Sequence, residues 1–169
     1  MGSRGPVGII VPWQGGGMPV RPDDHDWLAR AVELARHCPP STTAYAVGAV
    51  LVDGDGREWA RGHSRQHHPH DHAEEVALAA VGDGASPQRF AGATLYSSLE
   101  PCTSRRSRPV SCTARILAVG VGRVVLAWRE PDLLADCHGV ADLRAGGVEV
   151  VELPELAAAA REINAHLLS

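Results

Sequence analysis

The amino-acid sequence predicts an α/β protein in which helices cover both faces of a mixed five-stranded sheet, giving three layers. Two observations support this fold class. A valine-rich apolar run at residues 46–52 is followed by the turn Asp53–Gly56 and a second strand, which is typical of a β-hairpin. From residue 72 onward, helical and extended patterns alternate, which indicates later strands that are parallel and joined by helices.

The first helix precedes the hairpin. Its apolar side chains recur at helical spacing over residues 27–35, and either Asp23 or Asp24 can cap its N-terminus. It ends before Pro39, because the residue ahead of a proline is disfavoured in the helical conformation. The second hairpin strand then covers residues 58–62.

Helices and strands alternate over the rest of the chain. A helix at residues 72–81 carries alanine and leucine side chains for packing, and Gly82 stops it. Pro154 suits the first turn of a last helix, where the missing N–H costs nothing. The other predicted elements are strands at 93–99, 123–128 and 148–153, and helices at 113–119, within 133–143 and at 154–168.

Length and charge limit the class of protein. We expect residues 1–20, with their glycine run, to form a flexible arm and residues 21–169 to form one domain. No apolar stretch is long enough to span a bilayer and no secretory signal is visible, so the prediction is a cytoplasmic protein with no membrane partner. A net charge of −4 and few aromatic residues argue against a nucleic-acid partner.

Two short segments supply the groups of a hydrolytic zinc site. His72 and Glu74 lie in the first segment, and Cys102 and Cys112 in the second. Catalytic zinc takes three protein ligands and keeps a fourth position for water. Glu74 follows the histidine by two residues, which suits a proton shuttle beside the metal. His-x-Glu followed by Pro-Cys-x-x-Cys is the signature of zinc-dependent base deaminases, although nine residues separate the two cysteines here.

The predicted positions of these four residues bring them together. They fall near the starts of two helices that follow strands, and α/β sheets usually bind ligands at the carboxyl ends of strands. Taken singly, a histidine can be a cap, a cysteine a core residue, and Glu74 an ordinary first-turn acid. Disulfides are an alternative use of the cysteines, but this chain is neither small nor rich in cysteine, so Cys38 and Cys137 are expected to be reduced thiols.

The chain resembles the cytidine deaminase superfamily and, within it, the deaminase domain of riboflavin biosynthesis, from about residue 27 to residue 168. A wide gap between the cysteines is a trait of that branch. The resemblance implies a cytidine-deaminase-like fold, Zn²⁺ held by His72, Cys102 and Cys112, and a homodimer or homotetramer. The likeness is carried by Val47–Val52, His72–Glu74, Leu99–Cys102, Arg108–Cys112, Arg129–Asp132 and Ala145–Val150.

The sequence also departs from the family pattern. A Ser-Pro-Asn-Pro segment is typical ahead of the first strand, and Ala44 stands here where the asparagine would contact substrate. Many members are fused to a reductase domain, whereas this chain is expected to be a stand-alone deaminase. The arginines of the loop between Cys102 and Cys112, here called the cysteine loop, could bind a phosphate or form a charged flap over the pocket. The candidate substrate-binding residues are Ala44, Ser98, Arg105, Arg106 and Arg108.

The predicted function is hydrolytic deamination of a small-molecule aminated heterocycle, such as a nucleobase, a nucleoside or a pyrimidine. Zinc lowers the pKa of a bound water from about 15.7 toward about 7. Glu74 takes the water proton, passes it to the ring nitrogen and then protonates the departing amine. One alternative is the riboflavin-pathway phosphoribosylaminopyrimidine deaminase. Another is a non-catalytic structural zinc or partner-binding module, whose fourth ligand would be His70.

Overall fold

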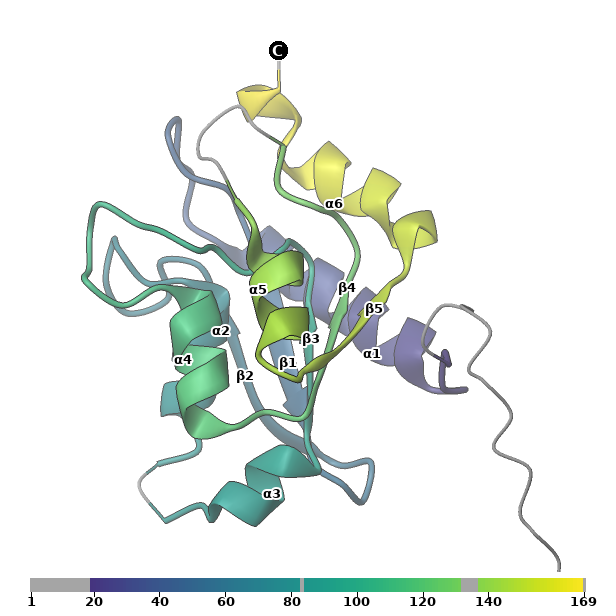
Figure 1. Ribbon diagram of the computed structural model, residues 1–169. Coiled ribbons are helices and arrows are strands. Elements are labelled where there is room, and N and C mark those ends of the chain that lie inside the picture. The colour runs from purple at the N-terminus through teal and green to yellow at the C-terminus, as the bar shows by residue number, and fades with distance from the viewer. Residues whose placement is uncertain (1–18, 83, 132–136, 169) are drawn as a thin grey trace, which may run out of the picture.

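The structure, a computed structural model, describes residues 19–82, 84–131 and 137–168 (Figure 1). Within these ranges five strands form one sheet in the order β2-β1-β3-β4-β5. Strand β1 pairs antiparallel with β2 and β3, whereas β3–β4 and β4–β5 are parallel. The predicted mixed sheet is therefore confirmed. The strands are β1 (Gly48–Val52), β2 (Glu58–His63), β3 (Thr94–Ser97), β4 (Arg123–Leu126) and β5 (Glu149–Glu152).

Helices cover both faces of the sheet, as predicted. On one face α1 packs against β1 and β3, with α6 beside its C-terminal end. On the other face α2 packs against β1 and β2, α5 packs against β5, and α4 lies between α2 and α5 (Figure 1). The helices are α1 (Asp24–Leu34), α2 (Ala73–Ala79), α3 (Pro87–Ala91), α4 (Cys112–Val119), α5 (Gly139–Ala145) and α6 (Ala157–Ile163).

Two strand glycines let the helices approach the sheet closely. A Cβ atom on Gly48 would lie 2.1 Å from the carbonyl oxygen of Ala31 in α1. A Cβ atom on Gly62 would lie 2.6 Å from Cβ of Val76 and 2.7 Å from the carbonyl oxygen of Ala73, both in α2. Real Cβ contacts are longer than this, so a side chain at either position would push a helix away from the sheet. The position of α2 therefore depends on Gly62.

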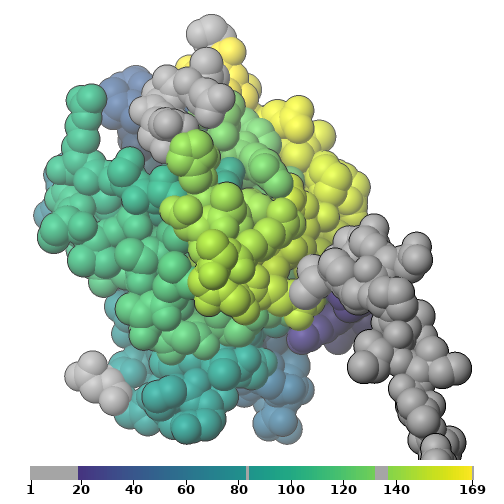
Figure 2. All heavy atoms as spheres, in the orientation of Figure 1, coloured from purple at the N-terminus to yellow at the C-terminus, as the bar shows by residue number. Residues whose placement is uncertain are grey.

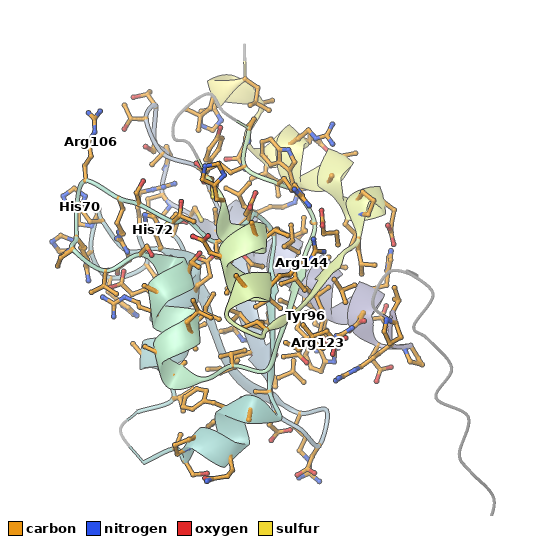
Figure 3. The ribbon with its side chains drawn as sticks, viewed as in Figure 1. His70, His72, Tyr96, Arg106, Arg123 and Arg144 are labelled. Atoms are coloured by element: carbon orange, nitrogen blue, oxygen red, sulfur yellow. The ribbon has the colours of Figure 1, made fainter. Side chains whose placement is uncertain are left out.

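A buried ion pair joins α1 to β4 at the end of the sheet away from the cysteines. Arg123 donates to both carboxylate oxygens of Asp24, at 2.7 and 2.8 Å, and the Tyr96 hydroxyl donates to the same carboxylate at 2.9 Å. Figure 3 shows Tyr96 and Arg123 lying together. Asp24 thus binds other elements and does not cap α1, and Asp23, at the cap position, makes no side-chain cap bond.

Two further differences from the prediction have physical causes. Helix α3 was not predicted, although the Ser86-Pro87 pair is a good start signal, and the Ser86 hydroxyl accepts a bond from the backbone N–H of Arg89. The last helix is broken at Asn164. Its side-chain amide bonds both backbone groups of Ala46 and the carbonyl of Ala160, in competition with regular helix geometry.

The remaining boundaries agree to within a few residues, except that part of the predicted 133–143 helix and residues 1–18 of the predicted arm lie outside the described residues. Pro19 is described, and its carbonyl accepts a hydrogen bond from Arg123. No helix within the described ranges combines the length and apolarity that a membrane crossing would need.

Candidate metal centre and active site

The sheet register brings the two halves of the site to one end of the molecule. Gly48 pairs with His63 at the end of β2, and Ala49 pairs with Ser97 at the end of β3. The carboxyl ends of these two strands therefore lie side by side across β1. The connection after β2 carries His72, and the chain after β3 carries Cys102, as expected for ligands in an α/β sheet.

His72, Cys102 and Cys112 form a group that can hold a metal ion. The ligand atoms that these side chains offer all lie within 4.8 Å of one another. Nδ1 of His72 is 3.5 Å from Sγ of Cys102 and 3.4 Å from Sγ of Cys112. One imidazole and two thiolates are ligands that zinc prefers, and three protein ligands leave one position open. The donor set fits catalytic Zn²⁺, so the three predicted ligands do come together.

Local structure favours the thiolate, the metal-binding form, at Cys102. Cys112 is the first residue of α4, and its backbone N–H points at Sγ of Cys102 at 3.4 Å. The hydrogen bond from the Cys112 side chain lowers the pKa of the Cys102 thiol well below its usual range. Thiolate is the form that binds metal, and helix N-termini stabilise it.

Glu74 is buried beside this group, in the first turn of α2. The Ser97 hydroxyl lies 2.8 Å from Oε1 of Glu74 and 2.7 Å from the carbonyl oxygen of Leu99, so it can donate its proton to either acceptor. Burial raises the pKa of Glu74. A carboxyl group whose pKa is raised toward neutrality is suited to both accept and return a proton. Ser97 was not predicted to contact Glu74.

A cavity of about 840 Å³ opens over Glu74, His72 and Cys102. Residues from the segment before β1, the β2–α2 connection, the chain after β3 and Glu130 line it. Figure 2 shows the loop between the two cysteines (green-teal) standing out at this end of the molecule, near the segment before β1 (blue). The volume is in the range of small-molecule sites.

Of the five predicted substrate-binding residues, three line the cavity and two do not. Ala44, Arg105 and Arg106 line the cavity. The Ser98 hydroxyl accepts a hydrogen bond from the backbone N–H of Gly48 at 3.1 Å, and Ser98 is not among the lining residues. Arg108 does not line the cavity either.

The guanidinium groups of Arg105 and Arg108 form ion pairs with Glu75, whereas the exposed Arg106 makes no ion pair within the described part of the chain. Figure 3 shows its side chain pointing outward from the loop.

Among the lining residues that were not predicted to belong to the site, three make contacts or have a pKa that bears on its chemistry. Tyr45 packs edge-on against Trp128, with ring centroids 5.7 Å apart. The pKa of Glu130 is raised to about 7 by burial, with repulsion from nearby acidic groups adding to the shift. Arg65 adopts a positive φ of 59° and donates to the carbonyl of Tyr45 at 3.0 Å, which fixes that wall of the cavity. Each role depends on tertiary contacts; only Glu130 lies in a segment, Arg129–Asp132, that carries the family likeness.

The fold and this site together define a metal-binding α/β domain of the deaminase type. Residues 21–128 match the family model described as the cytidine and deoxycytidylate deaminase zinc-binding region. The chain belongs to this family. The predictions of family, fold and zinc as cofactor are thereby confirmed.

Relatives confirm the resemblance to the riboflavin branch. A diaminohydroxyphosphoribosylamino-pyrimidine deaminase of Schizosaccharomyces pombe is 36% identical over 134 residues, covering 79% of this chain and 33% of the relative. Riboflavin biosynthesis protein RibD of Aquifex aeolicus is 37% identical over 150 residues, covering 86% and 38%. The chain thus spans about a third of the length of these relatives.

A solved structure shows the same fold. It is the diaminohydroxyphosphoribosylaminopyrimidine deaminase/5-amino-6-(5-phosphoribosylamino)uracil reductase of Thermotoga maritima. It superposes with a TM-score of 0.68 at 31% sequence identity, covering 83% of this chain and 38% of that one.

Proposed function

We propose that this protein is a zinc-dependent hydrolytic deaminase that releases ammonia from an aminated heterocycle. The observation that carries this proposal is the buried Glu74 carboxyl group, held by Ser97 beside a three-residue metal group at the floor of a cavity. A carboxyl group in this position can move protons, and an open metal position can bind water. Neither feature is needed for packing.

The chemistry divides between the metal and the chain. His72, Cys102 and Cys112 would hold the zinc, which would supply a water molecule acidic enough to give hydroxide at neutral pH. Glu74 accepts the water proton and delivers it to the ring nitrogen next to the carbon that is attacked. A C–O bond forms at that carbon, and the C–N bond to the amino group breaks. Glu74 then takes the proton of the hydroxyl group now attached to that carbon and gives it to the departing amine, so that the product carries a carbonyl and the amine leaves as ammonia.

The first substrate to test is a phosphoribosylaminopyrimidine. This choice rests on the names of the relatives at 36% and 37% identity. Arg106 supports it, because an exposed guanidinium at the cavity rim can bind a phosphate. Nucleobases and nucleosides are the competing substrates, since Ala44 at the cavity wall offers no side-chain polar contact. Comparing KM for phosphorylated and unphosphorylated forms in wild type and R106Q tests the phosphate contact.

The coordination set argues against a purely structural zinc module. A closed structural site uses four protein ligands. Among the described residues, the metal group holds three, and the exposed His70 is outside it. The deciding experiment is ammonia release across a panel of aminated pyrimidines, purines and nucleosides, with and without a chelator. If the protein needs zinc to fold but deaminates no compound of the panel, the structural module is favoured.

Replacing Glu74 by glutamine separates metal binding from proton transfer. We expect E74Q to retain zinc and to lose activity by about a hundredfold or more, because the amide cannot accept the water proton. Metal analysis and ammonia release, measured on the same preparation, check this. Stoichiometric zinc together with near-normal ammonia release would remove Glu74 from the mechanism.

A homodimer or homotetramer in the cytoplasm remains our proposal for the assembly and its location. The family resemblance supports the first, and four cysteines that form no disulfide support the second. Light scattering of the zinc-loaded protein measures the assembly directly.

A further inference from the structure

Glu75 is a buried carboxylate that the proposed chemistry does not use. It follows Glu74 in α2, and only 7% of its surface is exposed. Oε2 lies 2.9 Å from Nη1 of Arg105, and Oε1 lies 2.8 Å from Nη1 of Arg108 and 3.0 Å from Nη2 of Arg115. One carboxylate on α2 therefore binds three guanidinium groups from another part of the chain.

Two of these arginines belong to the cysteine loop, which joins the two cysteine ligands. Arg105 and Arg108 lie between Cys102 and Cys112, and the side chain of Arg105 is only 3% exposed. Arg115 lies on α4, the helix that begins at Cys112. The loop and the helix after it are thus both fastened to α2, the helix that begins immediately after His72.

A second carboxylate, in the segment before α2, extends the fastening. Asp71 accepts the other arm of Arg108, at 2.9 Å. Its second oxygen accepts the backbone N–H groups of His67 at 3.0 Å and His68 at 2.8 Å. Glu75 and Asp71 therefore lie on either side of His72 and Glu74 in the sequence. Arg106 is left at the tip of the loop with no ion pair in the described ranges.

This arrangement differs from an ordinary surface ion pair. Exposed pairs contribute little, whereas removing one member of a buried pair leaves an uncompensated charge. Burial opposes ionisation of Glu75, but Arg105, Arg108 and Arg115 outweigh it, so the pKa of this carboxyl group lies below its usual value. The carboxylate is charged whenever the enzyme is folded at neutral pH.

We propose that Glu75 is a positioning residue, which fastens the Cys102–Cys112 loop to α2 and so sets the distance between the two cysteine ligands and His72. The same contact fixes the rim of the cavity and presents Arg106 on it. Loss of the Glu75 carboxylate frees the loop, which weakens zinc retention and substrate binding without removing any group that reacts.

The test uses the zinc-loaded protein and the variant E75Q. We expect trypsin to cleave within the loop about tenfold faster, because a released loop samples open conformations more often. Cleavage falls after Arg105 or Arg106, since trypsin does not cut before Pro109. We also expect zinc loss to a chelator to be about tenfold faster. E149Q is the matched control: Glu149 likewise pairs with an arginine, Arg123, but lies on β5. It should leave both rates unchanged.

Three further variants keep the result decisive if E75Q folds poorly. R105Q alters only the loop, and it should reproduce the faster cleavage, now after Arg106. The double variant E75Q/R105Q should be no worse than E75Q alone, because the Glu75–Arg105 contact that R105Q breaks is already lost in E75Q. E75D, which keeps the charge, should restore part of the protection. Wild-type cleavage and zinc-loss rates in both E75Q and R105Q would overturn the proposal.

A kinetic measurement links the fastening to catalysis. We expect E75Q to raise KM by about tenfold with a smaller change in kcat, because the loop forms the rim and Glu74 is untouched. This part rests on the proposed deaminase function. If no compound is deaminated by the wild type, the cleavage and zinc-loss rates still decide the role of Glu75 independently. A fall in kcat with KM unchanged would contradict control of the rim.

Discussion

Ser97 and Ser98 are neighbours in the chain, but their hydroxyl groups serve different parts of the molecule. Ser97 lies against the Glu74 carboxyl group, whereas Ser98 holds the backbone N–H of Gly48 at the start of β1. Successive residues of an extended chain point to opposite sides, which explains the division. One residue therefore orients the carboxyl group to which we assign proton transfer, and the next stabilises the sheet.

Replacing each serine by alanine separates these effects. We expect S97A to lower kcat by about tenfold, because the Glu74 carboxyl group loses a hydrogen bond that stabilises its ionised form. S98A should keep kcat and lose about 1–3 kcal/mol of stability, because a buried N–H is left without its acceptor. Steady-state kinetics and thermal unfolding of both variants check this. A KM increase in S98A alone would instead favour the substrate contact inferred for Ser98 from the sequence.

At the scale of elements, α2 carries three of the groups that matter to the site. His72 stands at its N-cap position, Glu74 lies in its first turn, and Glu75 binds the cysteine loop. The helix is short, so its packing on β2 sets its position more than its own propensity does. That packing runs through Gly62, where the backbone of α2 comes too close for any side chain.

A methyl group at Gly62 should therefore damage both stability and activity. We expect G62A to destabilise the protein by about 1–3 kcal/mol through overpacking and to reduce activity further by displacing His72 and Glu74. The control is G54A in the hairpin turn, where a Cβ atom would meet its nearest neighbour at an ordinary 3.5 Å. Thermal unfolding and ammonia release measure the two effects. Equal behaviour of the two variants would mean that α2 does not need the close contact.

At the scale of the whole molecule, the Asp24–Arg123 pair joins the first helix to the start of β4. Both side chains are almost fully buried, and Tyr96 completes the contact. Burial alone would raise the pKa of Asp24, but the hydrogen bonds from Arg123, Arg21 and Tyr96 lower it below the ordinary value of 3.8. The pair then contributes stability above pH 3.8, and this contribution is lost as pH falls through the lower folded-state pKa.

The variant D24N should reveal this linkage. At neutral pH we expect a loss of roughly 3 kcal/mol, because Arg123 remains buried without its counter-charge. The difference from wild type should shrink as pH drops below 3.8. Asp23 is the adjacent, exposed control, and D23N should follow the wild-type curve. Chemical unfolding between pH 3 and pH 7 checks both variants, and a pH-independent deficit in D24N would contradict the assignment.

Sequence alone predicted the parts of this molecule that depend on local spacing. The hairpin, the later alternation and the four residues His72, Glu74, Cys102 and Cys112 all follow from short patterns. The uses of Glu75 and Arg105 could not be predicted in this way. Thirty positions separate them in the sequence, and only the packing of the cysteine loop on α2 brings them together. Arginines next to a cysteine ligand suggested a phosphate site, whereas two of the three are bound to a buried carboxylate.

Strand β3 has a further consequence, for tolerance to insertion and deletion. Tyr96 reaches Asp24 on the face covered by α1, and Ser97 reaches Glu74 on the face covered by α2. Side chains alternate along a strand, so slipping this strand by one residue would carry each polar group to the opposite face. Both layers would then lose a buried contact at the same step. The two adjacent polar residues, which point to opposite faces, thus fix the register of β3. We expect insertions and deletions in β3 to be far less tolerated than in the β1–β2 turn.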